Sequence, residues 1–150
     1  MPVSWNGLAV LKAVDHAVDV GLASLCNDIV ETAKAKMREP KTGIDYRKKW
    51  RRAGKKMPGK GKSAGYFKRV SSAPGEAPAV QSGDLFGHIN MEKLGHQAFA
   101  VGTDLKHGAW MEVGVPKGIA TRIKPRPYLR PAVYEHTGRD AEVHFAGKVP

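Results

Sequence analysis

Cysteine is nearly absent from this sequence, because Cys26 is the only one among 150 residues. A single thiol excludes an internal disulfide framework and suits a reducing compartment. Long apolar runs are also missing, since no stretch approaches the roughly 20 residues that span a bilayer. We therefore expect no membrane partner, and a single domain over residues 1–150 that buries its own core.

Acidic residues are scarce in one segment, which holds most of the charge. The chain has 25 Lys and Arg against 14 Asp and Glu, a formal net charge of +11. Residues 41–69 contain twelve of the basic side chains and one acid, Asp45. The rest of the chain holds thirteen basic and thirteen acidic side chains, so its formal net charge is zero. The sequence therefore predicts a neutral body that carries a basic arm, residues 41–69.

One long helix is predicted over residues 7–39. Asn6 is a suitable N-cap, and Pro40 cannot continue a helix. At about 1.5 Å per residue the helix would be roughly 50 Å long, which is long for a domain of this size. Most of it is expected to be core, and the alternative for one end is packing on a neighbouring subunit. The apolar face recurs at three- and four-residue steps, in Leu8, Leu11, Val14, Val18, Leu22, Leu25, Ile29, Ala33 and Met37.

The basic arm shows no sustained helical or strand period and is interrupted by glycines and a proline. Such a long irregular segment is unusual in a compact domain, so we expect the arm to be mobile alone and ordered by a partner. Tyr46, Trp50, Tyr66 and Phe67 lie among its charges, a mixture typical of contacts with phosphates and bases. A solvated loop, a polyanion contact and a subunit contact all stay open. The candidate contact residues are Arg47, Lys48, Lys49, Arg51, Arg52, Lys55, Lys56, Lys60 and Lys62.

Alternating apolar residues over 85–91 and 97–101 predict two strands, with residues 92–95 as the hairpin connection. The segment 108–114 is too short for an assignment. A final helix is predicted from about Leu129, where an early proline is tolerated. The predicted fold class is therefore α+β: a long N-terminal helix, a basic extended arm, a small antiparallel sheet and a C-terminal helix.

Catalytic patterns are absent or incomplete. Gly61-Lys62-Ser63 has the end of a phosphate-binding loop, but Lys56 stands where such a loop needs glycine. His136, Asp140 and His144 follow at four-residue steps, a spacing that can hold a metal on a helix. An intervening glycine disfavours a rigid helix there, so a solvated polar face is preferred. We expect no enzyme activity, no metal and no cofactor.

Three motifs follow one another in the second half of the chain: "SAPGEAPAVQSGDL" at 72–85, "GAWMEVG" at 108–114 and "PRPYLRPAV" at 125–133. In this order they resemble those of small tail-component and head–tail joining proteins of long-tailed bacteriophages. The departures are Ser82, Gly108, Val115 and Tyr128, where the family has threonine, tyrosine, threonine and phenylalanine. The matching positions, with Trp110 inside the second motif, are Ala73, Pro74, Gly75, Glu76, Pro78, Gly83, Leu85, Ala109, Glu112, Gly114, Pro125, Arg126, Pro127, Leu129, Arg130, Pro131 and Ala132.

The resemblance implies a structural virion protein of the phage neck or tail top. Such a protein forms a ring that joins head to tail or completes the tail, and DNA passes through it. The implied partners are other copies of the chain in a hexamer, with a dodecamer as alternative, and head-closure, tail-tube or terminator proteins. Genomic double-stranded DNA would be contacted without sequence preference. The implied location is the virion, and the host cytoplasm during assembly.

Charge and aromatic residues alone leave one alternative function, a basic module that binds nucleic acid non-specifically. The proline-rich segment is expected to be a positioned turn rather than a slack linker. Tyr128 and Leu129 are expected to anchor the last helix against the sheet. Arg126 or Arg130 is expected to meet a carboxylate, for which Glu112 is the candidate.

Overall fold

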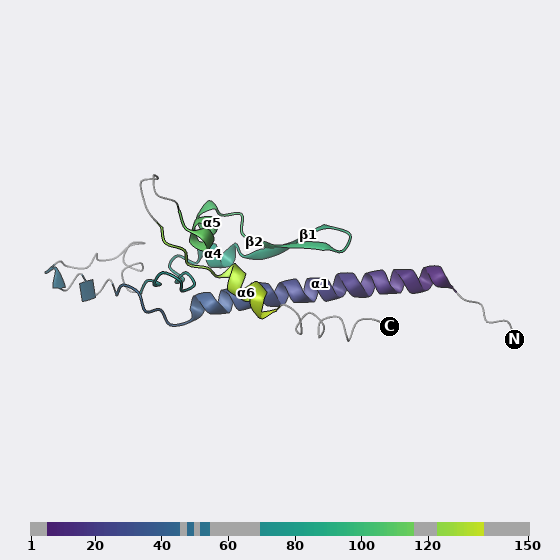
Figure 1. Ribbon diagram of the computed structural model, residues 1–150, viewed down its shortest axis with the longest axis horizontal. Coiled ribbons are helices and arrows are strands. Elements are labelled where there is room, and N and C mark those ends of the chain that lie inside the picture. The colour runs from purple at the N-terminus through teal and green to yellow at the C-terminus, as the bar shows by residue number, and fades with distance from the viewer. Residues whose placement is uncertain (1–5, 46–47, 50–51, 55–69, 116–122, 137–150) are drawn as a thin grey trace.

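The computed structural model describes residues 6–45, 48–49, 52–54, 70–115 and 123–136. A β-hairpin lies along one long helix, two short helices stand at the base of the hairpin, and the last helix crosses the long one (Figure 1). The predicted α+β class is therefore confirmed. The elements, in chain order, are α1 (Gly7–Arg38), α4 (Asp84–Gly87), β1 (Asn90–Gly95), β2 (Ala98–Gly102), α5 (Lys106–Val113) and α6 (Leu129–Glu135).

Helix α1 begins and ends where its sequence predicts. The side chain of Asn6 accepts a hydrogen bond from the backbone N–H of Ala9 at 3.2 Å, which satisfies one of the free donors of the first turn. Glu39 forms the C-cap, and Pro40 follows it.

Among the described residues, no helix combines the length and the apolar character that crossing a membrane requires.

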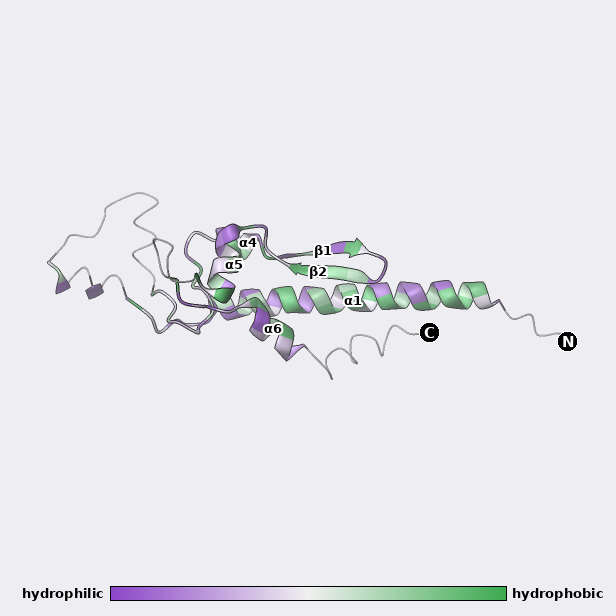
Figure 2. Cartoon of the chain, turned by 45° about the horizontal axis from the view of Figure 1, so that its top comes forward, coloured by the Kyte–Doolittle hydropathy of each residue, from purple (hydrophilic) through white to green (hydrophobic). Residues whose placement is uncertain are grey.

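Burial of α1 is concentrated toward its C-terminal end, and Ala17 and Gly21 are the buried residues of its first half. Ile29, Ala33 and Met37 are buried in the core. Leu8 and Leu11, on the same face, are 65% and 63% exposed. Both views show α1 running past the turn of the hairpin, so its first turns lie beyond the covering strands (Figures 1 and 2). The expectation that most of α1 is core holds for its second half and fails for its start.

The two strands form an antiparallel hairpin with Met91 opposite Val101 and Lys93 opposite Phe99. The prediction of a strand from residue 85 is wrong, because residues 84–87 form the helical turn α4 instead. Gly83 precedes that turn in the left-handed conformation, with φ of 93°, a geometry that ends extended structure.

The hairpin turn also lies later than predicted. Strand β1 runs through the predicted connection at 92–95, and the chain reverses at residues 96–97. Gln97 has a positive φ of 52° there, and its backbone N–H donates to a carboxylate oxygen of Asp19 at 3.0 Å. A contact with α1 therefore holds the turn, and the local sequence does not reveal that contact.

The segment that could not be assigned from sequence forms α5. Gly108 is buried on this helix, and a Cβ placed there would overlap Cγ2 of Thr103 and lie 2.9 Å from Cδ1 of Leu85. The helix ends at Gly114, whose φ is 78°. A Cβ at Gly114 would lie 2.9 Å from the carbonyl oxygen of Ile123. Neighbouring side chains therefore leave no space for a Cβ at Gly108, and the backbone of Ile123 leaves none at Gly114.

The core lies where α4, the base of the hairpin and α6 meet the C-terminal half of α1. Tyr128 and Ile89 are its largest fully buried side chains. Figure 2 shows hydrophobic and hydrophilic residues alternating along the whole length of α1. The core cluster consists of Ile29, Val30, Ala33, Met37, Ala77, Leu85, Ile89, Tyr128 and Ala132.

Helix α6 packs on α1, which corrects the expectation that it rests on the sheet. Lys36 of α1 forms an ion pair with Glu135 at the end of α6. The hydroxyl of Thr32 is hydrogen-bonded to Nε2 of His136 at 2.8 Å. These polar contacts fix the C-terminal end of α6 to the main helix, and Tyr128 at its start belongs to the same core cluster as Ala33 and Met37 of α1.

Candidate functional site

The proline-rich segment is a hydrogen-bonded turn, as predicted. Gly75 adopts a φ of 87°, which a side chain would disfavour. Its N–H donates to the carbonyl of Pro125 at 2.9 Å. The carboxylate of Glu76 accepts from the N–H of Ala73 at 2.8 Å and from both the N–H and the hydroxyl of Thr42. The turn is thus fixed to the end of α1 and to the third motif.

The hydrogen bonds around Glu76 also affect its ionisation. The Thr42 hydroxyl, followed by the N–H groups of Ala73 and Thr42, holds the pKa of the Glu76 carboxyl below its ordinary value. Each of these donors favours the charged carboxylate over the neutral acid. The turn is therefore held in its folded geometry by an ionised side chain.

Glu112 occupies the centre of the second motif and caps a helix other than its own. Its carboxylate accepts from the N–H groups of Tyr128, Leu129 and Arg130 at 2.8, 3.0 and 2.9 Å. Helix α6 has no side-chain cap from its own N-cap residue. A carboxylate at a helix N-terminus satisfies donors that otherwise lack partners and also complements the helix dipole.

The prediction that the side chain of Arg126 or Arg130 meets the Glu112 carboxylate is wrong. Glu112 meets backbone N–H groups, because the start of α6 directs them at α5. The Arg126 side chain instead donates through Nε to the carbonyl of Ser72 at 3.2 Å. The Arg126 N–H donates to the carbonyl of Met111 at 2.6 Å.

The third motif therefore lies between the first two and is hydrogen-bonded to both. We call this unit the motif junction, formed by residues 72–76, 111–112 and 125–130. Among the matching positions of the three motifs, Pro78 and Gly114 are buried, Pro127, Leu129 and Pro131 are half-buried, and Gly83 and Leu85 belong to the α4 turn. The exposed ones are Pro74, Gly75, Ala109, Pro125 and Arg130, and Trp110 inside the second motif is exposed as well.

Tyr128 is wholly buried beneath the motif junction. Its hydroxyl has no hydrogen-bond partner among the described residues. Burial, together with the nearby charge of Glu112, raises the pKa of Tyr128 to about 12. The hydroxyl also lies 3.0 Å from the position of a Cβ on Gly108. Position 108, where the resembling family has tyrosine, thus has no room for a side chain.

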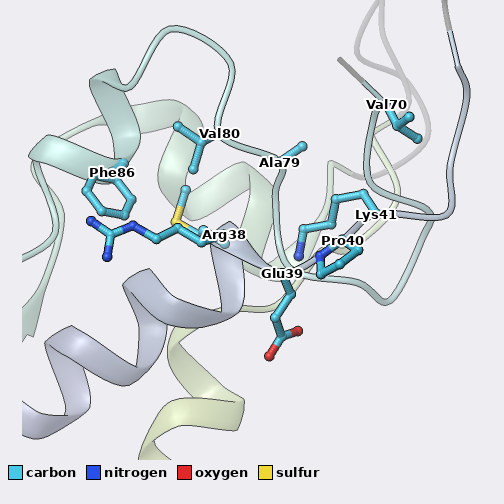
Figure 3. A pocket seen from close by; sticks show the side chains of 9 residues that line it. Arg38, Glu39, Pro40, Lys41, Val70, Ala79, Val80 and Phe86 are labelled. Atoms are coloured by element: carbon cyan, nitrogen blue, oxygen red, sulfur yellow. The ribbon is translucent and has the colours of Figure 1, made fainter.

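An apolar groove opens at the C-terminal end of α1. It has a volume of about 530 Å³ and lies between the helix end, the chain around Val70 and the segment that leads to α4. The guanidinium of Arg38 lies 4.5 Å from the ring centre of Phe86 at one edge (Figure 3). Sequence reasoning missed this groove, because four separate segments build it. Its lining residues are Met37, Arg38, Glu39, Pro40, Lys41, Val70, Ala79, Val80 and Phe86.

The two ends of the basic arm meet beside this groove. Asp45 forms an isolated antiparallel bridge with Val70, and the N–H of Ser71 donates to the carbonyl of Ile44 at 3.0 Å. A Cβ at Gly43 would overlap the carbonyl of Ser71 and lie 2.7 Å from the carbonyl carbon of Ser72. The arm therefore leaves and rejoins the body at one tightly packed point.

The arm begins with helical turns, contrary to the expected lack of regular structure. A carboxylate oxygen of Asp45 accepts from the N–H of Lys48 at 3.2 Å, which is the bond of an N-cap. Lys49 and Ala53 continue the pattern with backbone bonds to Asp45 and Lys49. Lys48, Lys49 and Arg52 are exposed. The predicted contact residues Arg47, Arg51, Lys55, Lys56, Lys60 and Lys62 lie outside the described residues, as does most of the arm.

The spacing of His136, Asp140 and His144 near the C-terminus is the remaining candidate for a metal site. His136 contacts Thr32, and Asp140 and His144 lie outside the described residues. Within the described ranges, no three His, Cys, Asp or Glu side chains are grouped so that they could hold a metal ion.

Comparisons of the chain with protein-family models, with curated proteins and with solved structures found no match.

Proposed function

We propose that this chain is a structural virion protein of the neck or tail top of a long-tailed bacteriophage. In this proposal it forms a ring that joins head to tail or completes the tail, and DNA passes through the ring. The observation that carries the proposal is the motif junction. The three motifs of the sequence resemblance are separated along the chain, yet they bond to one another through Gly75, Glu112 and Arg126.

A shared hydrogen-bonded unit is what three motifs of one family should form, whereas unrelated proline-rich turns would have no reason to meet. The charge distribution supports the same function. The body is neutral and the arm is basic, so cyclic symmetry would turn one arm into a band of positive charge. Such a band would attract phosphates of any sequence, as the passage of a genome requires.

The assembly can be tested on the purified full-length chain. We expect light scattering after size exclusion, together with negative-stain electron microscopy, to reveal a ring of six copies, with twelve as the alternative. We also expect mass spectrometry to detect the chain in purified virions. A monomer at all concentrations that is also absent from virions would refute the proposal. A monomer that binds DNA tightly, with a steep dependence on salt, would favour a nucleic-acid-binding module instead.

A further inference from the structure

The apolar face of α1 continues beyond the hairpin that covers it. The hairpin turn reaches α1 at Asp15 and Asp19, where Gln97 donates to both carboxylates. Leu8 and Leu11 lie before that point and are 65% and 63% exposed. We call these two residues the N-terminal ridge. Exposed apolar surface costs about 25 cal/mol per Å², so the ridge is a surface that gains free energy from a partner.

The apolar groove described above lies at the opposite end of the same helix. The ridge and the groove cannot meet within one chain. Residues 11 and 37 are separated by about seven turns, which is about 39 Å at 1.5 Å per residue, and α1 is continuous between them. The ridge of one copy can therefore reach only the groove of another copy.

We propose that the N-terminal ridge of one copy of this chain seats in the apolar groove of the next copy. The contact would be a helix in an apolar groove, anchored by side chains three residues apart. It uses two different surfaces, so it is heterologous and repeats around a ring or along a filament. The inference rests on the ring assembly proposed above and assigns the surfaces that form it.

Charge supports a second copy as the occupant of the groove. Arg38 is exposed at the groove edge, where its guanidinium lies over Phe86. On the ridge side, Asp15 follows Leu11 by one turn and keeps half of its side chain exposed. Seating the ridge would bring this acid toward the basic edge. A symmetric ridge-to-ridge contact would leave the groove open and stop at a dimer.

Disulfide trapping tests the contact directly. In a Cys26→Ala background, Leu8→Cys and Ala79→Cys are prepared as two separate proteins, one with its thiol on the ridge and the other with its thiol in the groove. Mixed at equal concentration under mild oxidation, they should form the 8–79 cross-link in several-fold excess over 8–8 and 79–79 links. Non-reducing gels and mass spectrometry of the linked peptides measure the ratio. Random pairing gives the mixed link a two-fold excess over each like link, so a yield of the 8–79 link at or below that two-fold excess would overturn the proposal.

The cross-linking result also separates the contact from the ring. Rings without the 8–79 link would overturn this contact and leave the proposed function standing. An 8–79 link in a chain that forms no ring would support the contact and refute the ring. Absence of both would refute both.

Two blocking variants provide an independent check. Leu8→Glu/Leu11→Glu removes the ridge and Ala79→Arg obstructs the groove, and each alone should shift the wild-type assembly to monomer mass. Their equimolar mixture should form a dimer of one copy of each, because one intact ridge still meets one intact groove. A mixture that stays monomeric while the wild type assembles would overturn the proposal. Circular dichroism and thermal unfolding of each variant establish that it is folded.

Discussion

Tyr128 combines complete burial with a hydroxyl that has no partner among the described residues. A buried hydroxyl without a hydrogen bond costs about 1–3 kcal/mol. The ring of the side chain still fills the core beneath the motif junction. The aromatic ring of Tyr128 therefore stabilises the folded state, and its unpaired hydroxyl destabilises it.

Replacing Tyr128 by phenylalanine should stabilise the protein. Tyr128→Phe keeps the ring and removes the desolvated hydroxyl, so we expect the free energy of unfolding to rise by about 1 kcal/mol. Urea denaturation measures this change, and an unchanged m value would show that the unfolded states are comparable. A loss of stability would show that the hydroxyl has a partner outside the described residues.

At position 108 the fold requires a residue without a side chain, because a Cβ there would overlap its neighbours. Gly108→Ala should destabilise the fold by about 1–2 kcal/mol, because overpacking a core outweighs the helix propensity gained from alanine. Gly87→Ala is the matched control, since a Cβ there has nothing within 4 Å. Thermal unfolding compares the two variants. Equal effects would mean that the core around position 108 relaxes freely.

At the scale of elements, α6 depends on an acceptor supplied by α5. Glu112→Ala leaves the first N–H groups of α6 without their carboxylate, and caps of this kind contribute about 1–2 kcal/mol. We expect a loss of that size in urea denaturation. Glu31→Ala, an exposed carboxylate on α1, should stay within about 0.5 kcal/mol of the wild type. A Glu112 variant as stable as the Glu31 variant would contradict the capping role.

The proline-rich turn makes the stability of the folded protein depend on pH, through Glu76. The pKa of Glu76 is lowered in the folded protein, so the native state binds fewer protons than the unfolded chain near that pKa. Its contribution is therefore complete above the unfolded pKa and is lost as the pH falls through the folded one. Between about pH 5 and 3, the wild type should lose more stability than Glu76→Gln. Parallel pH profiles of the two proteins would refute this.

Sequence reasoning recovered the elements whose signals are local. Helix α1 follows from its apolar spacing, from Asn6 and from Pro40, because caps and periodicity act within a few residues. The hairpin turn was misplaced, since the bond from Gln97 to Asp19 joins segments that are far apart in the chain. The sequence indicates Glu112 as a carboxylate with a partner near the third motif, but its backbone donors cannot be predicted, because which donors face it depends on how α5 meets α6.

The whole molecule divides its charge between a neutral body and a basic arm. Lys48, Lys49 and Arg52 are exposed, so they contribute little to the packing of the body. Neutral replacements at Lys48, Lys49, Arg51 and Arg52 should each change the free energy of unfolding by less than about 0.5 kcal/mol. Affinity for double-stranded DNA should fall, and the slope of its logarithm against log salt should weaken by about 0.9 for each phosphate that the variant no longer neutralises. Fluorescence polarisation at several salt concentrations measures both, and an unchanged salt slope would place the DNA-binding surface elsewhere.

The bridge between Asp45 and Val70 has a consequence for how such a chain can diverge. Residues 46–69 start and end at one fixed point of the body. Doubling the length of a loop whose ends are fixed adds only about 0.6 kcal/mol of closure cost. We therefore expect insertions, deletions and changes of charge between these two residues to leave the fold and the core of the body unchanged. A chain fixed in this way could acquire a new partner by exchanging this one segment, with no redesign of the protein that carries it.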